Sequence, residues 1–340
     1  MLDKSRVTLH DVADLAGVSH QTVSRVVNKN KSVRPGTRER VEAAILELGY
    51  RPNAIARSMV QGNTHTLGCI SPNLTDPVFT RIIESAQAEA RRLGYFILIG
   101  SASSVDEVQP LLDELLYRCV DGLIVLNARD DERYKLLEPV IRNNSPMVFV
   151  KNSAVDESVS SVRCDDIQGG YLATKHLLDF GHQQIATILG RQNEQCTSER
   201  IEGYKMALQE AGLSVDEKLI IHGDWSSQSG SDAVENLLKV SRDFTAIFAQ
   251  NDRMAAGAIR TLREAGFKIP EDYSIIGYDN GPLASLLDPP LTTIEQPLEE
   301  FGKQAANIII QTIQSDDPQL VDYCAVPELI QRLSTSKFPS

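Results

Sequence analysis

The sequence has few cysteines, and they are not arranged as disulfide or metal-binding pairs. Five cysteines are scattered over 340 residues, and no two form a C-x-x-C pair. Such thiols are typical of a reducing compartment. No apolar run reaches the roughly 18 residues of a membrane-spanning helix, and the start M-L-D-K-S-R-V-T-L-H lacks the apolar core of a signal peptide. We therefore expect a cytoplasmic protein without membrane contact.

Sequence signatures of common enzyme classes are also missing. The chain contains no G-x-x-x-x-G-K-[ST] loop, no G-x-S-x-G elbow, no H-E-x-x-H helix and no plausible dinucleotide fingerprint. The pair Asp165 and Asp166 could suggest acid–base catalysis. However, adjacent carboxylates on a strand point apart, and a crossover segment explains them as well. We expect no catalytic residue, no metal site and no cofactor.

Positive charge is scarce overall but concentrated at one end of the chain. The net charge is −12, yet residues 1–62 hold ten basic and six acidic side chains, a net charge of +4. The remainder therefore carries −16. A basic head on an acidic body indicates that the head binds an anion, with DNA as the leading candidate.

The head contains the pattern of a helix-turn-helix. Its helical patterns cover Leu9–Ala16, Gln21–Asn28 and Thr37–Leu48. Thr8 and Ser19 precede the first two helices and are good N-cap residues. Gly17, in the connection A-G-V-S, permits the turn that sets two helices at a steep angle.

The second of these helices has an apolar and a polar face. Val23, Val26 and Val27 share the apolar face, which we expect to pack inward. The polar face carries His20, Gln21, Ser24 and Arg25. In the DNA major groove, glutamine can pair with adenine and arginine with guanine. Hydroxyl and amide side chains suit phosphate contacts, and we assign these to Thr8, Ser19, Thr22 and Asn28.

From Thr66 onward, apolar runs of strand length alternate with helical patterns. The runs are T-L-G-C-I, Y-F-I-L-I-G, G-L-I-V-L, P-M-V-F-V, Q-I-A-T-I-L-G, K-L-I-I-H-G, T-A-I-F-A and Y-S-I-I-G-Y. This alternation is typical of parallel sheets in α/β proteins. It predicts two doubly wound lobes, with chain crossings near Arg163–Gly170 and Pro289–Gln296.

Each run ends in polar or turn-forming residues. These are Ser71-Pro72-Asn73, Ser101, Asn127, Lys151-Asn152, Arg191, Asp224-Trp225, Asn251-Asp252 and Asp279-Asn280. In open α/β sheets, ligands bind at the carboxyl ends of the strands. Two facing lobes would gather these residues around one cleft, which suits a polar molecule such as a sugar.

Several longer motifs resemble the lactose-repressor family of bacterial transcription regulators. They include T-L-H-D-V-A-D-L-A-G-V-S-H-Q-T-V-S-R-V-V-N, R-E-R-V-E-A-A-I-L-E-L-G-Y-R-P-N, S-E-R-I-E-G-Y, Q-N-D-R-M-A-A-G-A-I, I-I-G-Y-D-N and P-P-L-T-T-I-E-Q-P. The resemblance covers essentially the whole chain. It implies a three-helix headpiece in residues 1–51, a hinge helix and linker in 52–63, and a two-lobed effector and dimerisation domain of periplasmic-binding-protein type in 64–340. The expected lobes are 64–163 with 293–323, and 164–292 with 324–337.

For the DNA-binding part, the resemblance implies that His20, Gln21 and Arg25 contact operator bases. It also implies that a hinge helix enters the minor groove through Asn53, Ala56 and Met59. The family usually has leucine where this chain has Met59, which is a more flexible wedge. The alternative for Met59 is a core contact. Arg34 stands where relatives often place a serine cap, and it could instead reach phosphate.

For the effector cleft, the resemblance implies that four polar residues grip sugar hydroxyls: Arg200, Asn251, Asp279 and Gln296. Phe79 and Trp225 would add apolar faces, although core packing is the alternative for Trp225. Helix capping is the alternative for Asn251 and Asp252. Asp76 and Cys196 are weaker candidates; Cys196 lies where sugar-sensing relatives often have a small hydroxyl residue.

Together these features predict a repressor of carbohydrate-utilisation genes that binds a pseudo-palindromic operator as a homodimer and associates with the nucleoid when bound. A sugar-like effector would release it, with corepression as the alternative. A sugar-processing enzyme or a transport-type binding protein would leave the basic head unexplained. Beyond Leu333 the chain has no apolar heptad, so we expect a dimer and not a tetramer.

Overall fold

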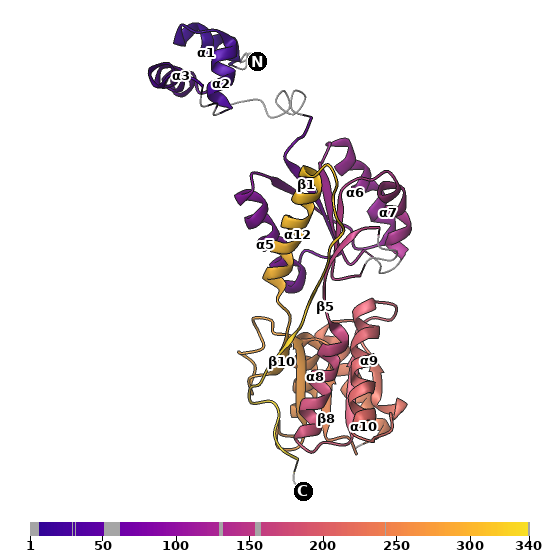
Figure 1. The fold of residues 1–340 in the computed structure, drawn as a ribbon. Helices are drawn as coiled ribbons and strands as arrows, with labels where there is room; N and C mark the ends of the chain where they lie inside the picture. Colours follow the sequence, from indigo (N-terminus) through magenta and orange to yellow (C-terminus); the bar gives the residue numbers. More distant parts are fainter. Residues whose placement is uncertain are drawn as a thin grey trace. The chain divides into compact units, whose positions relative to one another are not determined.

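The structure is a computed structural model, and it describes residues 7–28, 30, 32–50, 62–128, 132–153, 158–241 and 243–338. The chain divides into two compact units, Met1–Thr64 and His65–Ser340. Each is considered by itself (Figure 1). Among the described residues, no helix is both long enough and apolar enough to cross a membrane, and no cluster of side chains could hold a metal ion.

The first unit is a three-helix headpiece built from α1 (Leu9–Ala16), α2 (His20–Val27) and α3 (Pro35–Leu48). The expected helix-turn-helix is therefore present. Gly17 ends α1 with a φ of 64°, a conformation that glycine adopts without steric cost. The helix α3 begins earlier than its apolar pattern because Pro35 fits the first turn, where a missing N–H costs no hydrogen bond.

The headpiece core is small and lies between the three helices. The fully buried apolar side chains include Val12, Val23 and Val41. Val26 is also buried, whereas Val27 packs against the core only in part. The predicted apolar face of α2 is confirmed.

The first lobe of the second unit is a parallel sheet of six strands in the order β11-β5-β4-β3-β1-β2. The strands are β1 (Thr66–Ser71), β2 (Phe96–Ser101), β3 (Gly122–Leu126), β4 (Met147–Val150), β5 (Ser160–Cys164) and β11 (Asp322–Ala325). One face packs on α5 (Pro77–Arg92) and α12 (Leu298–Gln314), the other on α6 (Val105–Tyr117) and α7 (Arg133–Arg142).

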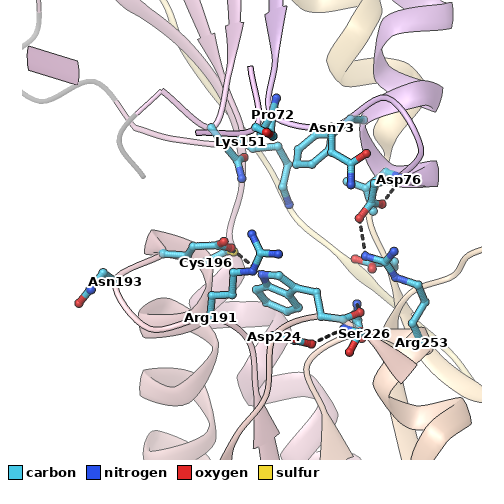
Figure 2. A pocket seen from close by; sticks show the side chains of 18 of the residues that line it. Pro72, Asn73, Asp76, Lys151, Arg191, Asn193, Cys196, Asp224, Ser226 and Arg253 are labelled. Atoms are coloured by element: carbon cyan, nitrogen blue, oxygen red, sulfur yellow. Dashed lines mark hydrogen bonds and ion pairs between the residues drawn. The ribbon is translucent and has the colours of Figure 1, made fainter. Parts of the chain in front are cut away.

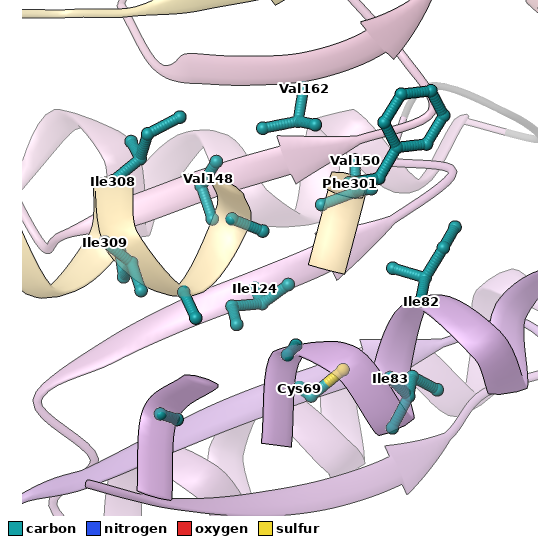
Figure 3. Close-up of a cluster of buried hydrophobic side chains, with 14 of the residues drawn as sticks. Cys69, Ile82, Ile83, Ile124, Val148, Val150, Val162, Phe301, Ile308 and Ile309 are labelled. Atoms are coloured by element: carbon teal, nitrogen blue, oxygen red, sulfur yellow. The ribbon is translucent and has the colours of Figure 1, made fainter. Parts of the chain in front are cut away.

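Segments far apart in the sequence form the core of this lobe. Figure 3 shows Phe301, Ile308 and Ile309 of α12 in one cluster with Ile82 of α5 and the strands. The two helices approach closely, because a Cβ on Gly302 would lie 2.0 Å from the carbonyl oxygen of Ile82. A helix from the end of the chain thus completes the lobe that the beginning of the unit starts.

The second lobe is a six-stranded sheet in the order β12-β10-β9-β8-β6-β7, parallel except for the β10–β12 pair. Its strands are β6 (Ile185–Leu189), β7 (Ile220–His222), β8 (Ala246–Ala249), β9 (Ser274–Asp279), β10 (Thr292–Glu295) and β12 (Glu328–Ile330). One face packs on α8 (Asp166–Asp179) and α9 (Gln195–Glu210). The other packs on α10 (Ser227–Val240) and α11 (Asp252–Glu264), and η2 (Glu217–Leu219) precedes β7. Two doubly wound lobes are confirmed.

The boundaries of the two lobes differ by a few residues from those expected. The expected first lobe includes residues 293–323, but β10 pairs with β9 and β12 in the second sheet as far as Glu295. Pro297, which cannot donate to a ladder, then precedes α12. Likewise β11 pairs with β5 as far as Ala325, so the last crossing follows it.

Candidate functional site

The side chains expected to contact DNA bases lie on the exposed face of α2. His20, Gln21 and Arg25 are all exposed, while Val23 and Val26 on the opposite face are buried. The His20 ring also packs against His10 of α1, with 5.1 Å between the ring centroids. This contact, which sequence reasoning missed, restricts the rotamers available to His20.

The side chains expected to contact phosphate have local structural roles. Thr8 closes a capping box with Asp11, whose carboxylate accepts the Thr8 N–H at 2.7 Å. Ser19 caps α2 by accepting the N–H of Thr22 at 3.3 Å. Asn28 donates weakly to the hydroxyl of Ser24 at 3.4 Å. The expected caps are confirmed, and a phosphate contact would be an additional role for the same hydroxyls.

The hinge residues cannot be placed in the same way. Asn53, Ala56 and Met59 lie outside the described residues. Arg34 is described, and it precedes α3 without forming a side-chain cap.

A cavity of about 640 Å³ lies between the two lobes at the carboxyl ends of their strands. Figure 2 shows side chains that enter it from both lobes. Its lining includes residues from every predicted strand end: Pro72, Asn73, Ser101, Asn127, Lys151, Arg191, Asp224, Trp225, Asn251 and Asp279. The rule that ligands bind at strand ends therefore located this cleft correctly.

Arg200 lines this cavity, and two of its guanidinium nitrogens donate to buried protein acceptors. It is 2% exposed, and its Nε donates to Asp166 at 2.7 Å while its NH1 donates to the carbonyl of Gln250 at 2.5 Å. Its guanidinium also covers the Tyr278 ring at 3.6 Å from the centroid. Burial alone would raise the pKa of Asp166, but Arg200 and Lys151 outweigh it and hold that pKa below its usual value. Asp166 is thus a positioning residue for Arg200.

Trp225 lines the cavity with its ring packed closely against Gly190. A Cβ on Gly190 would lie 1.9 Å from the ring, so only glycine permits this position. The indole N–H donates to Glu194 at 2.7 Å, and Asn251 Nδ2 donates to the Trp225 carbonyl at 3.1 Å. Asn251 also caps α11 through Met254. Asn251 therefore caps α11 and also lines the cavity, and its contact with sugar hydroxyls stays a prediction.

Gln296 does not line the cavity. It is 1% exposed, accepts from Lys151 Nζ at 2.5 Å and donates to Asp279 Oδ1 at 2.6 Å. It therefore acts on any ligand through those two neighbours. Burial raises the pKa of Asp279 to about 6, although Arg200 and Lys151 act in the opposite direction.

The remaining candidates separate into cavity and structural residues. Phe79, Cys196 and Asp76 line the cavity, and Asp76 also forms an ion pair with Arg253 at 2.5 Å that joins the lobes. Burial raises the pKa of the Cys196 thiol, which keeps it neutral. Asp165 caps α8 and Asp252 accepts from Thr293, and neither lines the cavity.

Several charged lining residues have no individual binding role in the sequence analysis, although some of them stand in its list of strand ends. The charged ones are Arg133, Lys151, Arg191, Glu194, Asp224 and Arg253. Lys151 follows β4 directly, and Arg191 and Asp224 come two residues after β6 and β7, so their position at strand ends was a usable signal. Glu194 and Arg253 stand at helix starts, a signal that does not separate them from ordinary first-turn residues.

Comparison with known proteins agrees with this architecture. A family model described as bacterial regulatory proteins, lacI family, matches residues 8–53. Another, described as periplasmic binding proteins and sugar binding domain of LacI family, matches residues 64–325. The HTH-type transcriptional repressor PurR of Vibrio atlanticus (strain LGP32) is 36% identical over 327 residues, which cover 96% of this chain and 97% of the relative.

Two solved structures are similar over nearly the whole chain. The lac repressor dimer bound to operator and the anti-inducer ONPF has a TM-score of 0.88 at 31% identity, covering 98% of this chain and 100% of that one. The complex of transcriptional regulator CelR with cellobiose has a TM-score of 0.75 at 34% identity, covering 97% and 100%. The resemblance inferred from the motifs is confirmed, as is the expectation that the chain is not an enzyme. The chain belongs to the LacI family of bacterial regulatory proteins, which bind DNA and respond to small molecules.

Proposed function

We propose that this protein is a transcriptional repressor that binds a pseudo-palindromic operator as a homodimer. The observation that carries this proposal is the exposed polar face of α2, on a helix whose opposite face anchors it in the headpiece core. His20, Gln21 and Arg25 would contact bases in the major groove. A two-fold dimer matches a palindromic site because each headpiece meets one half-site. As a regulator of bacterial genes, it would act in the cytoplasm, on the nucleoid.

The cleft between the lobes would hold the effector, a sugar or a sugar derivative. Its lining combines the Trp225 and Phe79 rings with the polar groups of Arg200, Asn251 and Asp279. Aromatic faces stack on sugar rings, and these polar groups bind hydroxyls. The effector would change operator affinity only by as much as it distinguishes two states of the lobes, and we propose that it releases the operator. The Met59 hinge would couple cleft and headpiece.

Base contact by α2 can be tested with Arg25→Met. The operator is first selected from random duplex DNA with the wild-type protein, and affinities for operator and random DNA are then measured by fluorescence anisotropy at fixed salt. Losing an arginine–guanine contact should reduce discrimination by about 1–3 kcal/mol. Arg40→Met removes the same charge from an exposed position on α3 and is the matched control. It should weaken binding to both DNAs equally, and equal discrimination by wild type and Arg25→Met would refute the assignment.

The effector can be sought by thermal shift with a panel of sugars and their derivatives. A ligand at about 100 times its dissociation constant stabilises the folded state by about 2.7 kcal/mol. Each hit is then added to the operator complex, where we expect release. Tighter operator binding would instead indicate corepression.

A further inference from the structure

Lys151 presents an incompletely paired ammonium group to the cleft. It directly follows β4 and has a φ of 74°, a backbone conformation that residues other than glycine rarely adopt. The residue lines the cavity and is only 7% exposed. Among the described residues, its Nζ has one hydrogen-bond partner, the neutral amide oxygen of Gln296. Because an ammonium has three donors, two remain for a ligand.

Two acidic groups of the cavity accept hydrogen bonds from residues other than Lys151. Glu194 accepts the Trp225 N–H, and Asp279 accepts from Gln296. Burial raises the pKa of Glu194 and brings that of Asp279 to about 6, so the protein environment disfavours both negative charges. No carboxylate in the described part of the chain forms a direct ion pair with Lys151. An anionic ligand would supply a direct ion pair that no described carboxylate gives Lys151.

The amino end of α9 lies beside this ammonium. The loop after β4 is held against α9, because Gln195 Oε1 accepts from the Ser153 N–H at 3.3 Å and from Asn152 Nδ2 at 3.5 Å. The helix has 16 residues, and its N-cap Glu194 makes no side-chain cap. The amides of its first turn carry partial positive charge, and Cys196 of that turn lines the cavity.

Arg191 adds a second cation to the same region of the cavity. It follows β6 closely, is exposed and lines the cavity. Lys151 and Arg191 both lower the pKa of Glu194, which places the two cations near the start of α9. Figure 2 shows them coming from opposite walls, Lys151 from the first lobe and Arg191 from the second. An anion held between them would also favour closure of the lobes.

We propose that the effector is an anionic polyhydroxylated molecule, a sugar phosphate or a sugar acid, whose negative group binds between Lys151, Arg191 and the amino end of α9. The inference rests on the proposed function, because it takes this cleft as the effector site. The ring of the effector would stack on Trp225, and its hydroxyls would bind Asn251. Neutral sugars would lack a direct ion pair with the Lys151 ammonium.

The test compares sugars with their phosphates and acids, using the full-length protein in calorimetric titrations. The panel contains glucose, glucose 6-phosphate and gluconate, the corresponding compounds of the other common hexoses and pentoses, and inorganic phosphate alone. We expect a sugar phosphate or a sugar acid to bind at least ten-fold tighter than its neutral parent sugar. The affinity for this anion should fall at high salt. The phosphate and acid arms distinguish the two kinds of anion.

The variant Lys151→Gln should weaken binding of that anionic probe at least ten-fold. The matched control is Lys135→Gln, whose ammonium lies on α7 with a side chain 68% exposed, and it should bind as wild type does. If Lys151→Gln does not fold, competition by inorganic phosphate against the probe in the wild-type protein serves instead, and we expect displacement.

Binding of neutral sugars alone, binding of no member of the panel, or an unchanged affinity in Lys151→Gln would overturn the inference. Operator release by a neutral sugar would do so while leaving the proposed function intact. By contrast, failure to select any operator sequence would count against the proposed function and not against the charge of the ligand.

Discussion

Replacing Arg200 with methionine should destabilise the second lobe more than any exposed arginine could. The guanidinium and the Asp166 carboxylate are each about 3% exposed as side chains and lie 2.7 Å apart. Removing one partner of a buried ion pair leaves the other charge uncompensated, which typically costs about 3–5 kcal/mol. Asp166 would keep the Tyr278 hydroxyl at 2.8 Å, so part of its hydrogen bonding survives.

The magnitude can be separated from simple loss of packing by a double-mutant cycle. Asp166→Asn alone leaves Arg200 buried with only neutral acceptors, and it should also cost several kcal/mol. In the double variant neither charge remains, so the loss should fall short of the sum of the single losses by about 1–3 kcal/mol. The cycle therefore reports the interaction itself.

The assay is urea unfolding followed by the fluorescence of Trp225, the single tryptophan, which lies in the same lobe. With a slope of about 2 kcal/mol per M, a loss of about 4 kcal/mol moves the midpoint by about 2 M. Arg142→Met provides the control, since its ion pair with Glu138 has an arginine side chain 78% exposed and should be worth about 1 kcal/mol or less. Additive losses in the cycle, or an Arg200→Met loss no larger than the control, would refute the reasoning.

Two further predictions concern pH and the cleft wall. Burial lowers the pKa of His182 in the folded lobe below its usual 6.5. Between these two pKa values the unfolded chain binds a proton that the folded lobe does not. The contribution of His182 to stability is therefore present above pH 6.5 and is lost as the pH falls toward the folded-state pKa. Asp252, whose pKa is raised to about 7, shifts stability in the opposite direction over the same pH range. The measurement is therefore the difference in urea midpoint between wild type and His182→Gln, followed from pH 8 to 5. A constant difference would contradict the prediction. Gly190→Ala should displace the Trp225 ring, shift its fluorescence and weaken effector binding at least ten-fold, whereas Gly36→Ala, whose new Cβ meets no atom within 4 Å, should do neither. Wild-type fluorescence and affinity in Gly190→Ala would show that the ring tolerates the contact.

Most of the headpiece could be predicted because its signals are local. Thr8 and Ser19 mark helix starts through bonds to residues three positions away, and Gly17 marks a helix end by its backbone conformation. The contact between His10 and His20 could not be predicted, because it depends on how α1 packs against α2.

The residues of the cleft were predicted only in part. The strand-end rule placed Lys151 and Arg191 at the cavity because the topology of a parallel sheet brings all carboxyl ends to one edge. Motif matching placed Gln296 on the wall, but the structure has it behind Lys151 and Asp279. Spacing along the chain does not tell which of several neighbouring polar side chains reaches a cavity.

The amino-acid sequence by itself determined the division of charge between head and body, the capped helices, the alternation of strands and helices, and the polar residues at strand ends. These features follow from interactions within a few residues or from the periodic spacing of apolar residues, so they can be predicted without any distant contact. Only the tertiary structure decided which charges are compensated. Asp166 forms an ion pair with Arg200 from 34 positions away, while the hydrogen bond of Lys151 within the described residues goes to an amide 145 positions away. Burial and pairing depend on distance in space, and that distance is set by the packing of the two lobes.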